Sequence, residues 1–418
     1  MLPFVPEPTT KWTLAALVVS SSLLLLALDG GLRGMRPRTL SVAFVGNSFT
    51  FVNDLPRVLE AMAGEDTVGR AEAGMEQDSC LHGGLSVTSL LERGNGMYAF
   101  WGNGNSYDDD GNKNNNEFSS NDDGSAGGFP DYGACTVSQL LLGYDEAIVS
   151  NDDDDENNNF EEYYTNDGLN PCFRDADYRA YSASLRSARK NPYGNKNNKN
   201  NNNNDDDENG ATPPRWDYVV INDQSMYPAV DSKRAKSASA LQYAYAPMLN
   251  ASGAVPVLYQ TWAYWRNDTD TVMDGLVDVP TFAKRLAEGY EYYAGVLGGE
   301  LPARKRPRIA PVGNAFLVLW EENISFWNRL FGEDLYHPSP HGTYLAACVV
   351  YATIYGRMPP ASTRFTTELF ARSRSMQLSG EEQPLPTEEE ALYLRWIAKR
   401  VALEGFVPRS LRTNRTRT

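Results

Sequence analysis

A serine follows the first apolar run of the chain, in a sequence that favours a sharp turn. Ser48 lies in GNSFT (residues 46–50), directly after the run Thr39–Val45. A glycine lets the backbone turn tightly, and the first turn of a helix leaves backbone N–H groups without helical acceptors. A serine in this setting can act as a nucleophile, with backbone amides nearby to bind an oxyanion. The alternative is structural, because Asn, Ser and Thr after a strand are common turn and helix-capping residues.

A nucleophilic serine needs a base, and the chain contains three histidines: His82, His337 and His341. Asp334 lies three positions before His337, a spacing at which the carboxylate can fold back within one turn and accept a hydrogen bond from Nδ1. Such a bond fixes the tautomer and stabilises the imidazolium, which is the orienting role in a catalytic triad. We therefore expect His337 to be the base and His341, nearer to the next helix, to be structural. The alternative is a polar loop in which Asp334 only forms a turn.

Two further positions are candidates for oxyanion donors. Asn222 follows the apolar run Trp216–Ile221, so its amide can point toward the same edge of a sheet. Gly84 belongs to the pair Gly83–Gly84, which precedes a helix predicted at Ser86–Glu92, and it can offer an unobstructed backbone N–H. Each also has a simpler interpretation as a turn residue. Their joint occurrence with the serine and the histidine, in this order, favours the catalytic interpretation.

Apolar runs and helical stretches alternate along the chain. Strands are predicted at Thr39–Val45, Trp216–Ile221, Val255–Tyr259 and Arg308–Val312. Helices are predicted at Leu55–Ala63, Lys233–Leu249, Phe282–Leu297, Thr343–Tyr355 and Glu388–Leu403. Strands that are apolar throughout, separated by helices, indicate a parallel sheet that is covered on both faces. Ligands of such sheets bind beyond the carboxyl ends of the strands, which is where the candidate residues fall.

The negative charge of the chain is concentrated in three Asn- and Asp-rich tracts. The 418 residues include 54 acidic and 38 basic ones, a net charge of −16. The tracts 103–128, 151–168 and 191–210 hold 18 of these acids and 3 of these bases, so the rest carries about −1. A nearly neutral body argues against nucleic-acid binding, which needs a basic face, while 41% apolar residues can form a core. We predict that the tracts are disordered insertions within one domain, residues 39–403.

The N-terminal segment is apolar enough to enter a membrane. Residues 12–28 are uncharged, and as a helix they would be about 25 Å long, at the short end of what spans a bilayer. We interpret residues 1–38 as a signal peptide or a retained single-pass anchor that directs the chain into the secretory pathway. A buried core helix is the alternative. Residues 404–418 are predicted to form a basic tail.

The four cysteines are compatible with an oxidising compartment. Cys348 lies in an apolar helical run and is expected to be a core thiol, whereas Cys80 has no obvious partner. Cys135 and Cys172 lie in loop-like sequence on either side of an acidic tract, so they are candidates for a disulfide.

Block by block, the sequence resembles the SGNH (GDSL-like) hydrolase superfamily. GNSFT resembles the first block, with Asn47 where many members have Asp, and Gly84 is similar to the second-block glycine. Asn222, followed by Asp, resembles the third block, although Val220 stands where Gly is usual. The segment Asp334–His337 is similar to the last block and is the most specific piece.

The resemblance covers roughly Thr39–Arg357 apart from the tracts. It implies a three-layer α/β/α sandwich with a mainly parallel sheet, and it implies neither a metal nor a cofactor. Members act on acyl esters, including acetylated carbohydrates and lipids. We therefore expect a serine esterase with Ser48 as nucleophile, a small-molecule or polysaccharide ester as substrate, and the membrane as a partner if the N-terminal helix is retained.

Two alternatives remain open at this point. The first is a secreted or membrane-tethered binding protein that keeps the fold, although the intact Ser, Asp and His argue against it. The second is an acyltransferase that uses the same triad. Trp262, Tyr264 and Trp265 follow the third predicted strand and are candidates for stacking on a sugar ring, or for packing under a loop.

The interpretation of the N-terminus leads to a first prediction. A fusion of residues 1–38 to a reporter is expected to enter the secretory pathway, because the apolar segment is long enough to engage a bilayer. Glycosidase-sensitive modification of the reporter measures entry, and resistance to carbonate extraction distinguishes an anchor from a cleaved signal. A reporter that stays cytosolic and soluble would show that the segment has another role.

Overall fold

The computed structural model describes residues 38–65, 72–96, 136–143, 215–265, 275–360 and 383–412. Residues 12–28, the three acidic tracts, Cys135 and Cys172 lie outside these residues, so the predictions made for them stay predictions. Among the residues that the structure describes, no helix is both long and apolar enough to cross a membrane.

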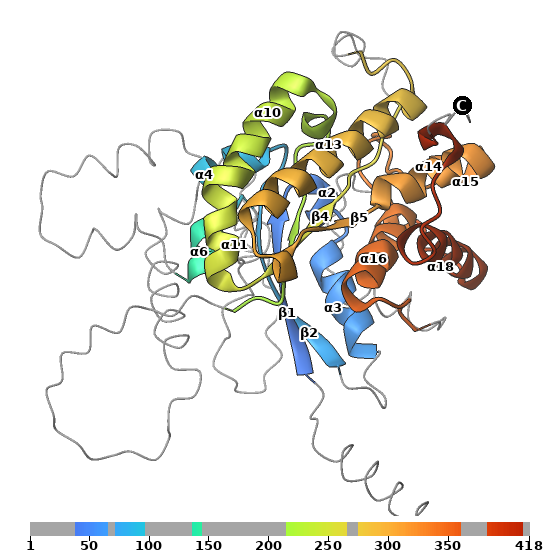
Figure 1. Ribbon diagram of the computed structural model, residues 1–418. Coiled ribbons are helices and arrows are strands. Elements are labelled where there is room, and N and C mark those ends of the chain that lie inside the picture. The colour runs from blue at the N-terminus through green and yellow to red at the C-terminus, as the bar shows by residue number, and fades with distance from the viewer. Residues whose placement is uncertain are drawn as a thin grey trace, which may run out of the picture.

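Five parallel strands form one sheet, in the order β2-β1-β3-β4-β5 (Figure 1). The strands are β1 (Arg38–Gly46), β2 (Glu72–Leu81), β3 (Tyr218–Ile221), β4 (Val255–Tyr259) and β5 (Arg308–Ala310). The predicted strands are confirmed with small changes at their ends. β3 begins two residues later than predicted, at Tyr218. β5 ends two residues earlier than predicted, at Ala310, because Pro311 and Val312 lead into a helix. β2 was not predicted, because its sequence EAGMEQDSCL has no apolar pattern.

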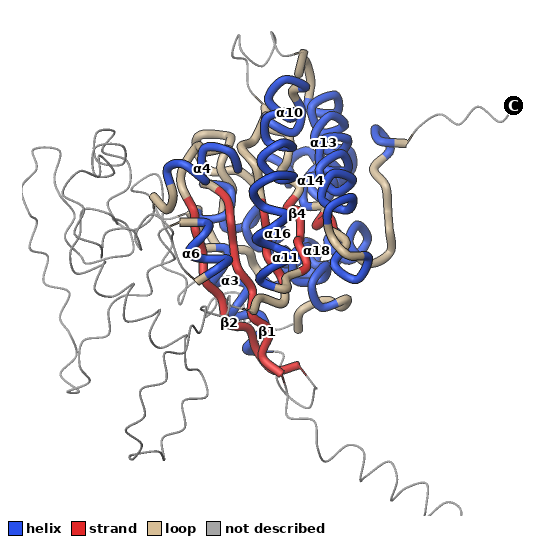
Figure 2. Tube along the Cα trace, turned by 60° about the vertical axis from the view of Figure 1, so that its left-hand side comes forward, coloured by secondary structure: helices blue, strands red, loops and turns tan. Residues whose placement is uncertain are grey.

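Helices cover both faces of the sheet, as the apolar strands predict (Figures 1 and 2). On one face lie α4 (Val87–Arg93), α6 (Val137–Leu142), α10 (Asp231–Ala240), a π-helical turn at Leu241–Tyr245 and α11 (Ala246–Ser252). On the other face lie α3 (Leu55–Glu65), α14 (Val312–Glu322), α15 (Ile324–Asn328), α16 (Pro340–Tyr355) and α18 (Glu388–Ala402). α13 (Val279–Glu300) contributes its first half to this second core and its last half to the first. The α/β/α fold class is therefore confirmed.

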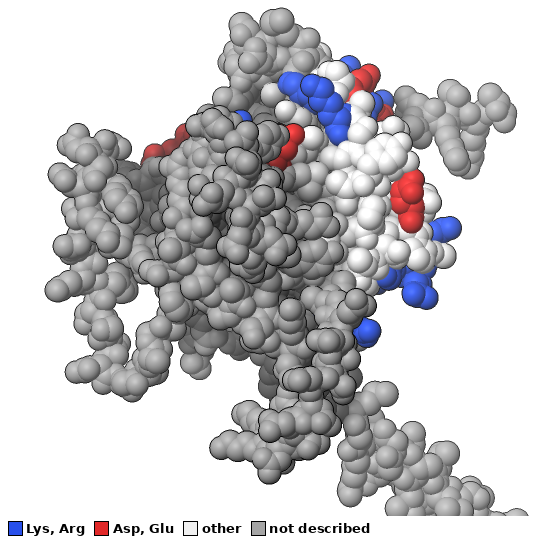
Figure 3. Space-filling view, turned by 90° about the vertical axis from the view of Figure 1, so that its left-hand side faces the viewer, with Lys and Arg blue, Asp and Glu red and all other residues white. Residues whose placement is uncertain are grey.

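The strands are apolar throughout because successive side chains enter opposite cores. Val42 and Phe44 of β1 pack into the core with α3 and α16, whereas Ala43 and Val45 pack into the core with α4 and α10. Cys348 is fully buried in α16, as expected of a core thiol. The polar exterior is mixed in sign. On the face shown in Figure 3, the described residues present basic and acidic side chains in small, separate groups among uncharged ones.

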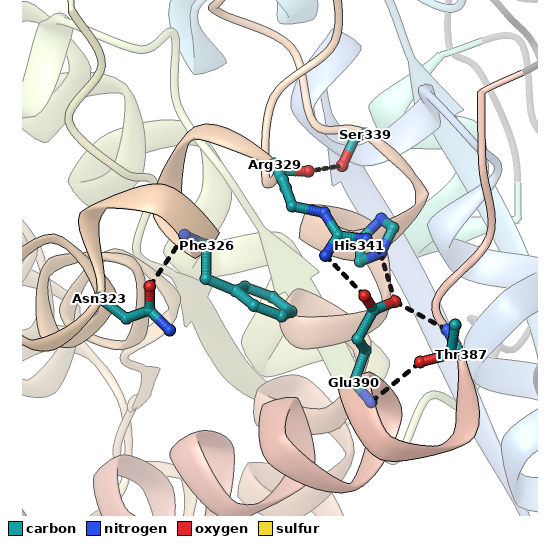
Figure 4. Close-up of polar contacts among 7 residues, drawn as sticks. All are labelled: Asn323, Phe326, Arg329, Ser339, His341, Thr387 and Glu390. Atoms are coloured by element: carbon teal, nitrogen blue, oxygen red, sulfur yellow. Dashed lines mark hydrogen bonds and ion pairs between the residues drawn. The ribbon is translucent and has the colours of Figure 1, made fainter.

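A partly exposed charged cluster joins the end of α15 to α16 and α18 (Figure 4). Glu390 accepts hydrogen bonds from Arg329 Nη1 (2.5 Å) and Thr387 N (2.8 Å), and its Oε2 lies 3.1 Å from His341 Nε2. Burial alone would raise the pKa of Glu390, but the bonds from Arg329, Thr387 and His341 hold it at about 2. Burial lowers the pKa of His341 below its ordinary value of 6.5; the bond to Glu390 opposes this shift, and the charge of Arg329 adds to it.

This cluster predicts that acid destabilises the fold through His341. The unfolded chain binds a proton on this residue at a higher pH than the folded chain does, so the free energy of unfolding falls as the pH drops below about 6.5. Replacing His341 by Gln is expected to flatten the pH dependence of that free energy between about pH 5 and pH 7. Urea unfolding at a series of pH values measures it.

His82, whose pKa burial also lowers, contributes in the same pH window, so it is retained in both proteins and only the difference between wild type and His341→Gln is interpreted. The stability contributed by ionised Glu390 is lost at lower pH, as the pH falls from its ordinary pKa of 4.5 toward about 2, and is therefore separate. A slope for His341→Gln equal to that of the wild type would contradict the assignment.

Candidate active site

Ser48 begins a short helix at the carboxyl end of the central strand β1. β1 ends at Gly46, Asn47 caps α2 (Ser48–Phe51), and the Asn47 side chain accepts a bond from Phe49 N at 3.2 Å. Ser48 is the first helical residue, so its backbone N–H is one of those without an intrahelical acceptor. Ser48 is buried, with 6% of its surface exposed to solvent. The predicted strand–turn–serine arrangement is therefore present.

Asn222, at the end of β3, is bonded reciprocally to Asn47. Asn47 N donates to Asn222 Oδ1 (3.2 Å), and Asn222 Nδ2 donates back to Asn47 Oδ1 (2.9 Å). The hydroxyl of Thr50 donates to the same Oδ1 at 2.5 Å, and Nδ2 also donates to the carbonyl of Asp223 at 3.2 Å. Both amide hydrogens of Asn222 thus have acceptors within the chain. Asn222 holds the serine turn here, and a role as oxyanion donor, which stays a prediction, requires that it release one of these bonds.

Gly46 is necessary for this contact. A Cβ on Gly46 would lie 1.6 Å from Asn222 Oδ1, which no side chain can tolerate. The glycine thus allows the end of β3 to approach the end of β1 closely enough for the two asparagines to bond.

The turn that carries Gly84 lies beside the serine turn. β2 pairs with β1 as far as Leu81 opposite Gly46, and His82 N donates to Gly46 O at 3.0 Å. Asn47 Nδ2 donates to Leu85 O at 3.0 Å, which fixes the far side of the turn. Gly84 has a φ of +71°, a conformation that favours glycine, and it is exposed. The turns that carry Ser48 and Gly84 are therefore bonded to each other through Asn47, and the role of Gly84 as an oxyanion donor stays a prediction.

Asp223, which follows β3 in the chain, bonds to the start of α4 and so links the Gly84 turn to the end of β3. Its Oδ1 accepts bonds from Val87 N (3.0 Å), at the start of α4, and from Gln224 N (2.8 Å), while its Oδ2 accepts one from Tyr293 OH (2.8 Å). Burial raises the pKa of this carboxyl, and the bonds that it accepts only partly offset the shift. Asp223 is thus an interior anchor for the turn that precedes α4, and the sequence analysis assigned no role to it.

Asp334 and His337 are bonded to each other in the loop between α15 and α16. Asp334 Oδ2 lies 2.5 Å from His337 Nδ1, and Asp334 Oδ1 accepts bonds from the backbone N of Tyr336 and of His337, both at 2.9 Å. Burial raises the pKa of Asp334, but the bonds from His337 and Tyr336 together outweigh it, so the pKa lies below its ordinary value. An ionised Asp334 at neutral pH therefore holds the imidazole through Nδ1, as the spacing predicts.

The loop with His337 packs against the helix of Ser48. The ring of Phe49 meets the imidazole edge-on, with ring centroids 5.9 Å apart, and meets Tyr336 at 4.8 Å. Within the described part of the chain, Ser48 makes no direct hydrogen bond to His337. Hydrogen bonds between nucleophile and base are often long in enzymes without substrate and tighten on binding.

The other two histidines face elsewhere. His82 Nδ1 lies 3.0 Å from the carbonyl of Gly94, after α4, and His341 belongs to the cluster with Glu390. His341 lies in the first turn of α16, which is capped by Ser339. These positions fit the structural role expected of His341.

Of the three aromatic residues considered for stacking on a sugar, two belong to the core. Trp262 is fully buried and stacks on Phe49, while Tyr264 is 2% exposed and packs on Tyr336. Trp265 is 51% exposed and stacks on Trp320 of α14. Among the described residues, no group of three or more His, Cys, Asp and Glu side chains is placed to hold a metal ion.

Comparisons with known proteins found two solved structures with a similar chain. One is a protein from Slackia heliotrinireducens described as "a putative SGNH hydrolase", with 18% identity, covering 76% of this chain and 100% of its own, at a TM-score of 0.36. The other is a DUF4886 family protein from Bacteroides uniformis, with 14% identity, covering 88% of this chain and 97% of its own, at a TM-score of 0.44. No family model matches the chain, and no curated protein does.

The contact between Gly46 and Asn222 leads to a prediction on stability. Replacing Gly46 by Ala is expected to lower the free energy of unfolding by about 1–3 kcal/mol, because the new methyl group forces the two asparagines apart. Thermal or urea unfolding measures the change.

The control is Gly64→Ala in α3, where an added Cβ meets nothing within 4 Å. This control is expected to raise the free energy of unfolding by roughly 0.5–1 kcal/mol, as alanine replaces glycine inside a helix. Equal effects of the two substitutions would show that close approach at Gly46 is unimportant.

Proposed function

We propose that the protein is a serine esterase that hydrolyses acyl esters, with Ser48 as nucleophile, His337 as general base and Asp334 as the residue that orients His337. The observation that carries the proposal is the Asp334–His337 bond, made on a loop that packs against the helix beginning with Ser48. An imidazole held by a carboxylate through Nδ1 has Nε2 available to exchange a proton with a serine hydroxyl.

The reaction divides into two acyl transfers. His337 Nε2 takes the proton of Ser48 Oγ as the oxygen attacks the ester carbonyl, and it then gives this proton to the departing alcohol. A water molecule attacks the acyl-serine with His337 again as base, which releases the acid and restores the serine. The negative charge on the carbonyl oxygen requires N–H donors in both steps, and the backbone amides of Ser48 and Gly84 are the donors that we assign, with Asn222 as a third.

The substrate that we propose is an acyl ester, including an acetyl ester, of a carbohydrate or a lipid. This choice rests on the resemblance of the sequence blocks to SGNH hydrolases. Transfer of the acyl group to a sugar hydroxyl instead of water uses the same residues, and the product of the reaction distinguishes the two. A binding protein without activity would need none of the bonds that Asp334 makes to His337.

A fluorophosphonate probe followed by peptide mapping tests the proposal. Labelling is expected at Ser48 alone, and Ser48→Ala is expected to lose both labelling and hydrolysis of a short activated ester. Asp334→Asn removes the carboxylate that fixes the tautomer of His337, so kcat is expected to fall by about 10³-fold or more with the fold intact.

The matched control is His341→Gln, which alters a histidine of the neighbouring helix that does not face the site. Its activity is expected to stay within a few-fold of wild type. Hydrolysis by Ser48→Ala at close to the wild-type rate would rule out the assignment. A wild-type protein that neither reacts with the probe nor turns over esters would favour a binding protein.

A further inference from the structure

Among the described residues other than glycine, left-handed backbone occurs in the two segments that carry Ser48 and His337. In the part of the chain that the structure describes, three residues other than glycine have a positive φ: Asn53 (56°), Asp54 (52°) and Leu335 (57°). The first two come directly after α2 and its C-terminal residue Val52, and Leu335 lies inside the Asp334–His337 turn. Such conformations cost free energy and persist only where the surroundings enforce them, often at functional sites.

Asn53 uses this conformation to reach the loop that carries the histidine. Its side chain is buried, with 3% of its surface exposed. Asn53 Nδ2 donates to the carbonyl oxygen of Pro338 at 2.9 Å and to Thr343 Oγ1 at 3.0 Å, so both of its hydrogens have acceptors. Pro338 is the residue after His337, so one of these bonds ends on the Pro338–Ser339 peptide, one residue beyond the histidine.

Asp54 holds the next position of the turn. Its carboxylate pairs with Arg57 Nη1 at 2.7 Å, and its carbonyl accepts the bond from Val58 N at 3.0 Å in the first turn of α3. The chain therefore leaves α2, passes through two left-handed residues and enters α3, with the Asn53 side chain directed to the histidine loop.

We propose that Asn53 is a positioning residue, which sets the distance between Ser48 and His337 by tying the carbonyl of Pro338, the residue after His337, to the end of the serine helix. The proposal rests on the proposed function, since it concerns the same two residues. Asn53 does not act on the substrate; it acts through the position of His337. Asparagine suits this role because it accepts left-handed backbone and has two donors, whereas aspartate would face the Pro338 carbonyl with an acceptor.

Two substitutions test the tether. Asn53→Gly keeps the left-handed turn without strain but removes both bonds, and Asn53→Asp keeps the shape but not the donors. Both are expected to lower kcat by about 10–100-fold with KM within a few-fold of wild type, because small displacements of a catalytic group cost that much. Arg57→Gln is the matched control, since it loosens the same turn at Asp54 and leaves the bonds of Asn53 in place. Its kcat is expected to stay near wild type.

A second measurement tests the effect of Asn53 on the position of His337 independently of esterase activity. The chain contains three histidines, so the ring ¹H–¹⁵N signals can be assigned by substitution. Asn53→Gly and Asn53→Asp are expected to shift the His337 signals and leave those of His82 unchanged, and circular dichroism confirms folding. If one variant does not fold, the other carries the test.

Each result has one consequence. Wild-type kcat in a folded Asn53 variant would overturn the proposal, whether or not the His337 signals move. A loss of kcat that Arg57→Gln reproduces would overturn it too, because instability would then explain the loss. If the wild-type protein hydrolyses no ester and Ser48 resists the fluorophosphonate, the esterase proposal fails, and the His337 signals alone then decide whether Asn53 positions this loop.

Discussion

The reciprocal bonds between Asn47 and Asn222 are the constraint on which the site depends. They join the ends of two adjacent parallel strands, and they form only because Gly46 has no side chain where Asn222 Oδ1 lies. Buried amides that satisfy each other in this way resist rearrangement, since breaking one bond leaves a donor and an acceptor unpaired in the interior. The position of Ser48 is therefore fixed by two strands and not by its own short helix.

This arrangement has a consequence for the chemistry of the corner. Because Asn222 uses both amide hydrogens within the chain, the donors that remain for an oxyanion without rearrangement are backbone N–H groups. The turn at Gly84, which we propose as the source of one such donor, is held by Asn47 on one side and by the buried Asp223 on the other. Burial of the Asp223 carboxyl is costly, and the three bonds from Val87, Gln224 and Tyr293 offset part of that cost.

The sequence predicted those parts of the site that are local. The Asp334–His337 bond spans three positions, and the turn before Ser48 directly follows an apolar strand, so short patterns reveal both. β2 was not predicted, because this polar edge strand lacks the run of apolar residues by which the other strands were predicted. The bond from Asn53 to Pro338 joins positions 285 residues apart, and no spacing indicates such a partner. The one available signal was the pair Asn53-Asp54 after a short helical segment, since these residue types favour left-handed backbone.

The two halves of the site are built by different physical means, which explains why a tether between them matters. The serine corner consists of buried amides at strand ends. The histidine loop reaches solvent, with the Asp334 side chain 43% exposed, and it keeps its shape through backbone bonds such as Gly332 N to His337 O at 2.8 Å. The loop is well defined internally, and two further hydrogen bonds join it to the segments that follow β4 and β3: Trp262 Nε1 donates to Tyr336 O and Tyr336 OH donates to Ser225 Oγ, both at 3.2 Å. Aromatic packing of Phe49 on His337 resists separation without fixing direction, whereas a hydrogen bond fixes both distance and angle. The buried bond from Asn53 fixes the backbone after His337, as the bond from Trp262 fixes the backbone before it, and Asn53 does so from a left-handed turn.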